Sequence, residues 1–218
     1  MAFAFPLTTE QFMARLPIAD ITFEPTEAME YSETGGGEIL TADHGVQLWH
    51  GRITLGDMTP DEAFDVLPLI AVARQRGASF MVHDVRAPGP RHDRTGAILG
   101  ASTPVLSAVL ANRREIRIGG LPQGYKIQPF DYIAFSYGEN PIRYALHRAV
   151  NTATAGAGGV AWTTEVTPNI RPGYNLAAPV TLLRAACKAI IVPGSYQPGR
   201  RKGTLTAGVS FDFIQTLR

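Results

Sequence analysis

Residues 114–150, REIRIGGLPQGYKIQPFDYIAFSYGENPIRYALHRAV, decide the class of fold because they place several short strand patterns between closely spaced turns. Polar and apolar residues alternate over 114–118, and aromatic and β-branched residues are frequent over 132–137, as strands require. Glycines and a proline between these two segments predict a turn. Residues 142–150 fit either a strand or a helix, and the turns that bracket them favour a strand.

The same pattern continues downstream of this stretch. A glycine-rich loop at 154–159 precedes a predicted strand at 160–166, and another predicted strand covers 178–183 after Pro168 and Pro172. About five or six short strands in roughly eighty residues, with a turn signal every ten or so, are typical of small closed barrels and sandwiches. We therefore predict a small β-barrel in this part of the chain.

One strong helix signal lies upstream. Thr59-Pro60-Asp61-Glu62 has the spacing of a capping box, with proline at the first helical position. Apolar residues recur behind it at helical intervals, and Gly77 predicts the C-terminal end. Pro68 lies inside this pattern and predicts a kink.

Short strands are also predicted outside the barrel-like stretch. Residues 46–55 fit two short strands or one bulged strand. Strand patterns recur at 79–83, 188–192 and 209–214, with a polar turn predicted over 193–203.

Strand patterns at both ends of the chain, with a barrel-like segment between them, indicate an inserted domain. We expect residues 1–95 and 184–218 to form one discontinuous domain and residues 96–183 to form a second, inserted domain. The expected fold is mainly β with one principal α-helix, in which a β-sandwich or barrel domain carries a small inserted β-barrel.

Composition and charge favour a globular protein and argue against a nucleic-acid-binding or disulfide-stabilised one. Of the 218 residues, 45% are hydrophobic and 18% are charged, which is typical of a globular chain. Lys and Arg number 20 against 19 Asp and Glu, so the chain lacks the basic excess typical of nucleic-acid binding. The single cysteine, Cys187, excludes an intramolecular disulfide and a multi-thiolate metal site. The sequence shows no targeting segment and no apolar run of membrane-spanning length, so we expect a soluble protein made in a reducing cytoplasm.

Catalytic motifs are missing from the sequence, which has no nucleophile elbow, phosphate-binding loop, zincin histidine pair or dinucleotide fingerprint. Gly35-Gly36-Gly37 lacks the Lys-Ser/Thr that a phosphate loop needs, and we interpret it as a plain loop. His83-Asp84 and His92-Asp93 together offer imidazole and carboxylate ligands for a divalent ion. The alternative is an exposed polar loop whose histidines bond to the backbone, and we favour this second interpretation.

Other chemically suggestive residues also have structural interpretations. Cys187 with a histidine could act as a nucleophile, but its apolar neighbours favour a small core residue. His147 is expected to be a partly buried strand residue. Arg200-Arg201-Lys202 fits a phosphate contact or a solvated hairpin tip, and we favour the tip. Trp49 and Trp162 are expected to anchor the core or a subunit interface rather than to stack on sugars. We predict no enzyme activity and no catalytic residue, cofactor or metal ion.

Three segments, in order, resemble a recurrent pattern in tail proteins of long-tailed bacteriophages and related gene-transfer particles. They are Leu121-Pro122-Gln123-Gly124-Tyr125, Pro129-Phe130-Asp131-Tyr132-Ile133 and Ala145-Leu146-His147-Arg148-Ala149-Val150. Phe130 stands where that pattern has glycine. The flanks resemble the ring-forming domain of distal tail proteins, through Trp49 and residues 58–63, 76–80 and 209–214. The resemblance covers roughly residues 40–218.

This resemblance implies a structural virion protein rather than an enzyme. Distal tail proteins form a hexameric ring at the distal end of the tail, where they join the tail tube to the tail hub or tip. The tape measure protein and later the DNA pass through the lumen of the ring. By resemblance we expect a homo-oligomer that contacts the tail tube, hub and tape measure proteins, with no specific DNA binding and no membrane contact.

Two alternatives stay open. The inserted barrel is also compatible with a carbohydrate-binding module for host recognition, in which Trp162, Tyr137, Tyr144 and Tyr174 supply stacking faces. A related ring protein of the hub or tube fits the same residues.

Overall fold

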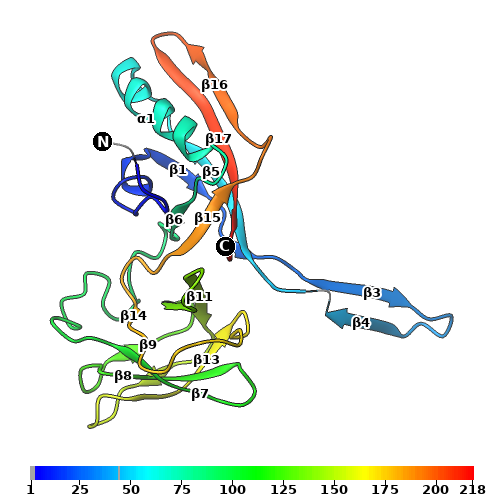
Figure 1. The fold of residues 1–218 in the computed structure, drawn as a ribbon, viewed down its shortest axis with the longest axis vertical. Helices are drawn as coiled ribbons and strands as arrows, with labels where there is room; N and C mark the ends of the chain where they lie inside the picture. The colour runs from blue at the N-terminus through cyan, green and yellow to red at the C-terminus, as the bar shows by residue number, and fades with distance from the viewer. Residues whose placement is uncertain (1–2, 44) are drawn as a thin grey trace.

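The computed structural model describes residues 3–43 and 45–218. The chain is mainly β, with 41% strand and 8% helix, which confirms the fold class expected from the turn-rich sequence. Figure 1 shows two sheets, one above the other, and a hairpin that projects away from both. Among the described residues, no helix is both long and apolar enough to cross a membrane.

The larger sheet combines both ends of the chain. Its main path runs β1-β5-β17-β15-β6, with β2 paired to β5 and β16 paired to β17. The strands are β1 (Ile18–Ile21), β2 (Glu24–Pro25), β5 (Trp49–Leu55), β6 (Phe80–Val82), β15 (Cys187–Ile191), β16 (Gln197–Lys202) and β17 (Leu205–Gln215). A short 3₁₀ helix, η1 (Met13–Arg15), precedes β1.

Two details of this sheet differ from the sequence-based prediction or resolve it. Residues 46–55 contain a single strand, β5, and the register irregularity lies opposite it, between Ile18 and Asp20 of β1. The polar turn predicted over 193–203 is wrong, because most of that segment forms β16. Backbone pairing with β17, from Gln197 opposite Ser210 to Lys202 opposite Leu205, holds this polar strand in place without an apolar pattern.

Gly51 lets the chain segment after β1 lie directly against β5. A Cβ atom added at Gly51 would lie 1.8 Å from the carbonyl oxygen of Thr22, which is far inside contact distance. Only glycine therefore permits this backbone approach.

The predicted helix is α1 (Pro60–Ala73). Its capping box is complete, because the Glu62 amide donates to Thr59 Oγ1 and the Thr59 amide donates to Glu62 Oε2 at 2.8 Å. The helix continues through Pro68. It buries one apolar stripe, which consists of Ala63, Val66, Leu69, Ile70 and Ala73.

The smaller sheet is built from the middle of the chain. Its strand order is β14-β10-β11-β13-β8-β7. The strands are β7 (Val105–Val109), β8 (Glu115–Gly119), β10 (Tyr132–Tyr137), β11 (Arg143–Ala149), β13 (Ala161–Thr167) and β14 (Val180–Thr181). Residues 142–150 thus form a strand, as the flanking turns predicted.

This sheet curls back on itself until its two outer strands meet. The Leu106 amide of β7 donates to the Ala178 carbonyl at 3.0 Å, and the Val180 amide of β14 donates to the Pro104 carbonyl at 2.8 Å. A pair of short strands, β9 (Lys126–Ile127) and β12 (Ala153–Thr154), lies beside it. The result is barrel-like, with a separate apolar core that includes the fully buried Tyr125.

The two sheets share apolar contacts where they meet. The core of the larger sheet extends into the smaller one and includes Tyr132 and Ala134 of β10 and Leu146 of β11. The exact domain boundaries proposed from the sequence stay a prediction.

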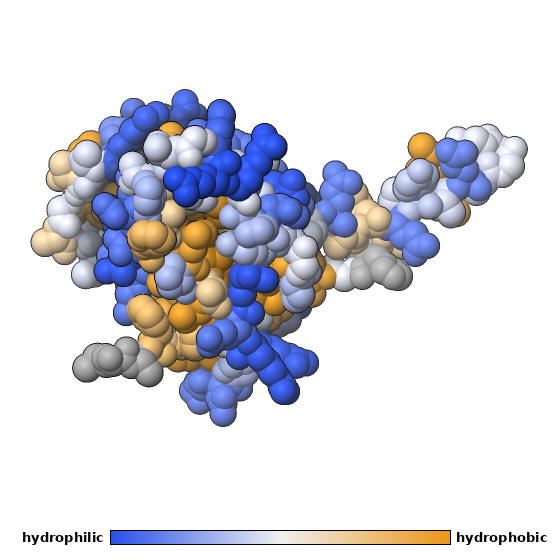
Figure 2. Space-filling view, turned by 90° about the horizontal axis from the view of Figure 1, so that it is seen from above, coloured by the Kyte–Doolittle hydropathy of each residue, from blue (hydrophilic) through white to orange (hydrophobic). Residues whose placement is uncertain are grey.

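The projecting hairpin consists of β3 (Met29–Glu33) and β4 (Ile39–Asp43), which together form a separate two-stranded sheet. We call residues 27–43 the arm. Gly37, with φ of +82°, closes the turn in a conformation that favours glycine, which fits the loop predicted for the three glycines. Figures 1 and 2 show the arm standing clear of both sheets.

Candidate functional site

One face of the arm exposes three apolar side chains, which alternate with polar residues across the hairpin. Met29, Tyr31 and Ile39 lie in alternate cross-strand pairs, opposite Asp43, Thr41 and Glu33, so they occupy the same side of the hairpin. Their exposed fractions are 58%, 71% and 64%. Figure 2 shows hydrophobic and hydrophilic residues together on the arm, away from the rest of the surface.

The arm is also acidic. Residues 27–43 include Glu27, Glu30, Glu33, Glu38 and Asp43 but no lysine or arginine. The whole chain has 19 acidic residues, so the rest of the sequence contains 14 acidic residues and all 20 Lys and Arg. Opposite charge is therefore segregated between the arm and the remainder of the chain.

A two-stranded sheet of this kind has open edges as well as an exposed apolar face. Both features favour pairing with another chain, and soluble proteins usually cover or blunt them. The arm is thus the strongest candidate for an interaction site in the described part of the chain.

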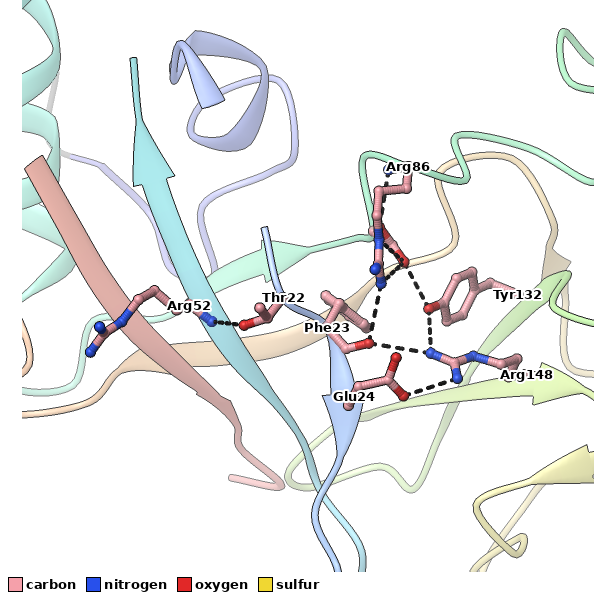
Figure 3. A network of polar contacts seen from close by, with 8 residues as sticks. Thr22, Phe23, Glu24, Arg52, Arg86, Tyr132 and Arg148 are labelled. Atoms are coloured by element: carbon pink, nitrogen blue, oxygen red, sulfur yellow. Dashed lines mark hydrogen bonds and ion pairs between the residues drawn. The ribbon is translucent and has the colours of Figure 1, made fainter. Parts of the chain in front are cut away.

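A second candidate is the junction of the two sheets, where a polar network joins them (Figure 3). Arg148 of β11 donates through Nη2 to the Tyr132 hydroxyl at 2.9 Å, and this hydroxyl donates to Asp84 Oδ2 at 3.0 Å. Arg86 donates to both carboxylate oxygens of Asp84, at 2.9 and 2.8 Å. Arg148 also donates to Glu24 Oε2 at 3.0 Å. Burial is the main reason why the pKa of Tyr132 is raised.

Aromatic rings surround the Arg148 guanidinium. Its central carbon lies 4.4 Å from the ring centroid of Phe130, 5.2 Å from that of Trp49 and 5.3 Å from that of Tyr132, all within cation–π range. Phe130 has a φ of +79°, a left-handed conformation at the position where the resembled pattern has glycine. The ring of Phe130 thus packs against Arg148 despite the backbone strain.

Trp49 is the apolar centre of this junction. It is fully buried, and its Nε1 donates to the Leu146 carbonyl of β11 at 2.7 Å. Its ring lies 5.2 Å from Phe23 and 5.6 Å from Tyr132. The polar network and the aromatic cluster connect β2, β5 and the loop after β6 with β10 and β11 of the smaller sheet. Their hydrogen bonds, ion pairs and ring contacts therefore hold the two sheets together.

A small cavity of about 20 Å³ lies next to Trp49, between the two sheets. Its lining includes His147, whose Nδ1 lies 2.7 Å from the Pro168 carbonyl. A carbonyl only accepts, so Nδ1 carries the proton, and Nε2 has no hydrogen-bond partner in the described part of the chain. Burial lowers the pKa of His147 to about 4.

This buried histidine predicts a pH-dependent stability. Between pH 6.5 and pH 4 the unfolded chain binds a proton at His147 and the folded chain does not, so stability falls as the pH falls through this window. The loss attributable to this residue is about 3 kcal/mol of unfolding free energy. Urea unfolding from pH 7 to pH 4 measures it, with His147→Gln, which stays neutral, as the comparison. Equal pH slopes for the two proteins would contradict the assignment.

The histidine–aspartate pairs do not assemble into a metal site. Among the described residues, no group of three or more His, Cys, Asp or Glu side chains is placed to hold a metal ion. Asp84 pairs with Arg86, Asp93 accepts from the Leu99 amide at 2.8 Å, and the His92 ring packs edge-on to Tyr125. The exposed polar loop favoured for these pairs is wrong, because His83, Asp84 and Asp93 are buried. Burial lowers the pKa of His83.

The remaining candidate residues are dispersed. Cys187 is fully buried in the core of the larger sheet, as predicted, and burial raises the pKa of its thiol. Residues 200–202 lie exposed at the end of the β16–β17 hairpin, as expected. Of the two positions expected for the tryptophans, core or subunit interface, Trp49 takes the core. Trp162 is 55% exposed and stacks under Arg117 at 4.5 Å, so the core position is wrong for it and the interface position stays a prediction. Tyr137 is 4% exposed, so it does not join Trp162 in an open stacking surface.

Sequence reasoning missed the arm and the Asp84–Arg86–Tyr132–Arg148 network. A signal for the arm was present, since strand-like residues flank Gly35-Gly36-Gly37 and no basic residue interrupts the acidic run. No comparable signal marks the network, because its members lie far apart in the chain.

No protein-family model matches the chain. A search of curated proteins gave no match.

Proposed function

We propose that this protein is a structural component of a phage-like tail, a distal tail protein that forms a closed ring of six copies between the tail tube and the tail hub. The ordered motifs over residues 121–150 support this proposal through their resemblance to tail proteins. The observation that carries it is the exposed arm, because an apolar, acidic hairpin of this kind needs a partner to cover it.

Ring formation follows from the asymmetry of the surface. An arm on one side and an acceptor elsewhere make a head-to-tail contact, and repetition of such a contact gives either a closed ring or an open filament. Closure requires a fixed angle between arm and acceptor, and the network that joins the two sheets holds the two parts of the body together. Members of the proposed assembly would include the tail tube, hub and tape measure proteins, with DNA passing through the lumen without specific binding.

The native mass of the purified chain tests this proposal. Over a rising concentration series, we expect a discrete species of six subunits to replace the monomer, because each arm is covered only when a neighbour is present. Native mass spectrometry and light scattering both report this number. A chain that stays monomeric throughout, or that polymerises without a discrete end point, would contradict the closed ring.

A further inference from the structure

A groove of about 620 Å³ lies beside the root of the arm. Its apolar lining comes from Tyr137, Pro141 and Pro172 of the smaller unit and from Val46 and Leu217 of the larger one. The groove therefore lies where the two sheets meet.

Three arginines also line this groove, namely Arg143, Arg171 and Arg218. Within the described part of the chain, none of them forms an ion pair with a carboxylate. Arg171 donates through Nη2 to the Gln47 carbonyl at 2.6 Å, and the Arg143 guanidinium lies 6.0 Å from the Tyr137 ring centroid. The groove thus combines an apolar floor with cationic groups that lack anionic partners.

The arm is also apolar on part of its surface, but its charge is opposite to that of the groove. Its Met29, Tyr31 and Ile39 face is apolar, and its charged residues are all acidic. The arm points away from its own body in Figure 1. We infer that the groove is the acceptor for the arm of a second copy of this chain, with the arm's carboxylates facing Arg143, Arg171 and Arg218. This inference rests on the proposed function, because it names the contact by which copies join.

The β16–β17 hairpin is the competing acceptor, because Arg200, Arg201 and Lys202 also concentrate positive charge. These three side chains are exposed and charged, so they offer Tyr31 and Ile39 no apolar side chain of their own. The groove is apolar like the arm and carries the opposite charge. We therefore prefer the groove to the hairpin as the acceptor.

Engineered disulfides locate the contact. One preparation carries Tyr31→Cys in the arm, and a second carries Leu217→Cys in the groove; the native Cys187 is buried and does not compete. Mixed in a glutathione redox buffer, the two should form a covalent heterodimer. Matched acceptors are Arg114→Cys, exposed on the outside of the barrel, and Arg200→Cys, on the competing hairpin, and neither should cross-link to Tyr31→Cys.

Charge reversal measures the electrostatic part. Arg143→Glu should weaken association between copies by about tenfold or more, and high salt should weaken the wild type more than this variant. Arg114→Glu changes the same charge outside the groove and should have little effect. Combining Arg143→Glu with Glu33→Arg should restore part of the loss. Arg143→Gln, which removes the charge without adding one, and circular dichroism of each variant separate weakened docking from misfolding.

The outcomes distinguish this inference from the proposed function. A six-subunit species with cross-linking at Arg200→Cys, or with no response to Arg143→Glu, overturns the groove and leaves the ring. Cross-linking at Leu217→Cys in an assembly that never stops at six supports the groove and overturns the closed ring. A chain without any self-association overturns both.

Discussion

Removal of the arm is expected to leave a folded chain that stays monomeric at every concentration. Replacing residues 30–42 by Asn-Gly joins Met29 to Asp43, which face each other across the hairpin, through a two-residue turn of a favoured type. The change removes Tyr31 and Ile39 and with them most of the apolar surface that a neighbour would cover. Native mass over the same concentration series measures the result.

Stability provides the control for this experiment. The residues of β3 are exposed along their whole length, so their removal should change the free energy of unfolding by no more than about 0.5 kcal/mol. The substitution pair Tyr31→Ser and Ile39→Thr keeps the hairpin length and removes two of the three exposed apolar side chains on this face, and it should also prevent assembly. Six-subunit species formed by the arm-deleted chain would show that the arm is not the contact that joins the copies.

Trp49→Ala is expected to lower the free energy of unfolding by about 3–5 kcal/mol, the usual cost of emptying a buried aromatic site. The loss includes ring contacts to Phe23 and Tyr132 and the hydrogen bond to Leu146, and those to Tyr132 and Leu146 cross from the larger sheet to the smaller one. Because whole domains are stable by only about 5–15 kcal/mol, this variant should be close to unfolded at 37 °C. Urea denaturation followed by far-ultraviolet circular dichroism measures the change.

The other tryptophan is the matched control. Trp162 is 55% exposed, so Trp162→Ala should cost less than about 1 kcal/mol. Trp49→Phe keeps a ring and leaves the Leu146 carbonyl without its donor, and it should fall between the two at about 1–3 kcal/mol. Similar losses for Trp49→Ala and Trp162→Ala would contradict the role assigned to Trp49 as the centre of the junction.

Local signals in the sequence were sufficient for the helix and for most of the barrel. The capping box at Thr59 could be predicted because all its hydrogen-bond partners lie within four residues of sequence. The local sequence pattern is therefore enough to place the start of the helix. The strand at Arg143–Ala149 could be predicted for a similar reason, since closely spaced turns leave too little room for a helix. In contrast, β16 was predicted as a turn because its polar residues gain their conformation only from pairing with β17.

The sequence by itself determined a mainly β chain with one capped helix and a cysteine in the core, because hydrophobic periodicity and turn residues are local properties. Only the tertiary structure decided that Asp84, Arg86, Tyr132 and Arg148 meet at one junction, and that Arg143, Arg171 and Arg218 share one groove. These residues come from separate strands and loops, and their distances depend on how two sheets pack. The acidic arm depends on both. Its negative charge can be read from one short segment of the sequence, whereas its exposure to another molecule depends on how it projects from the two sheets.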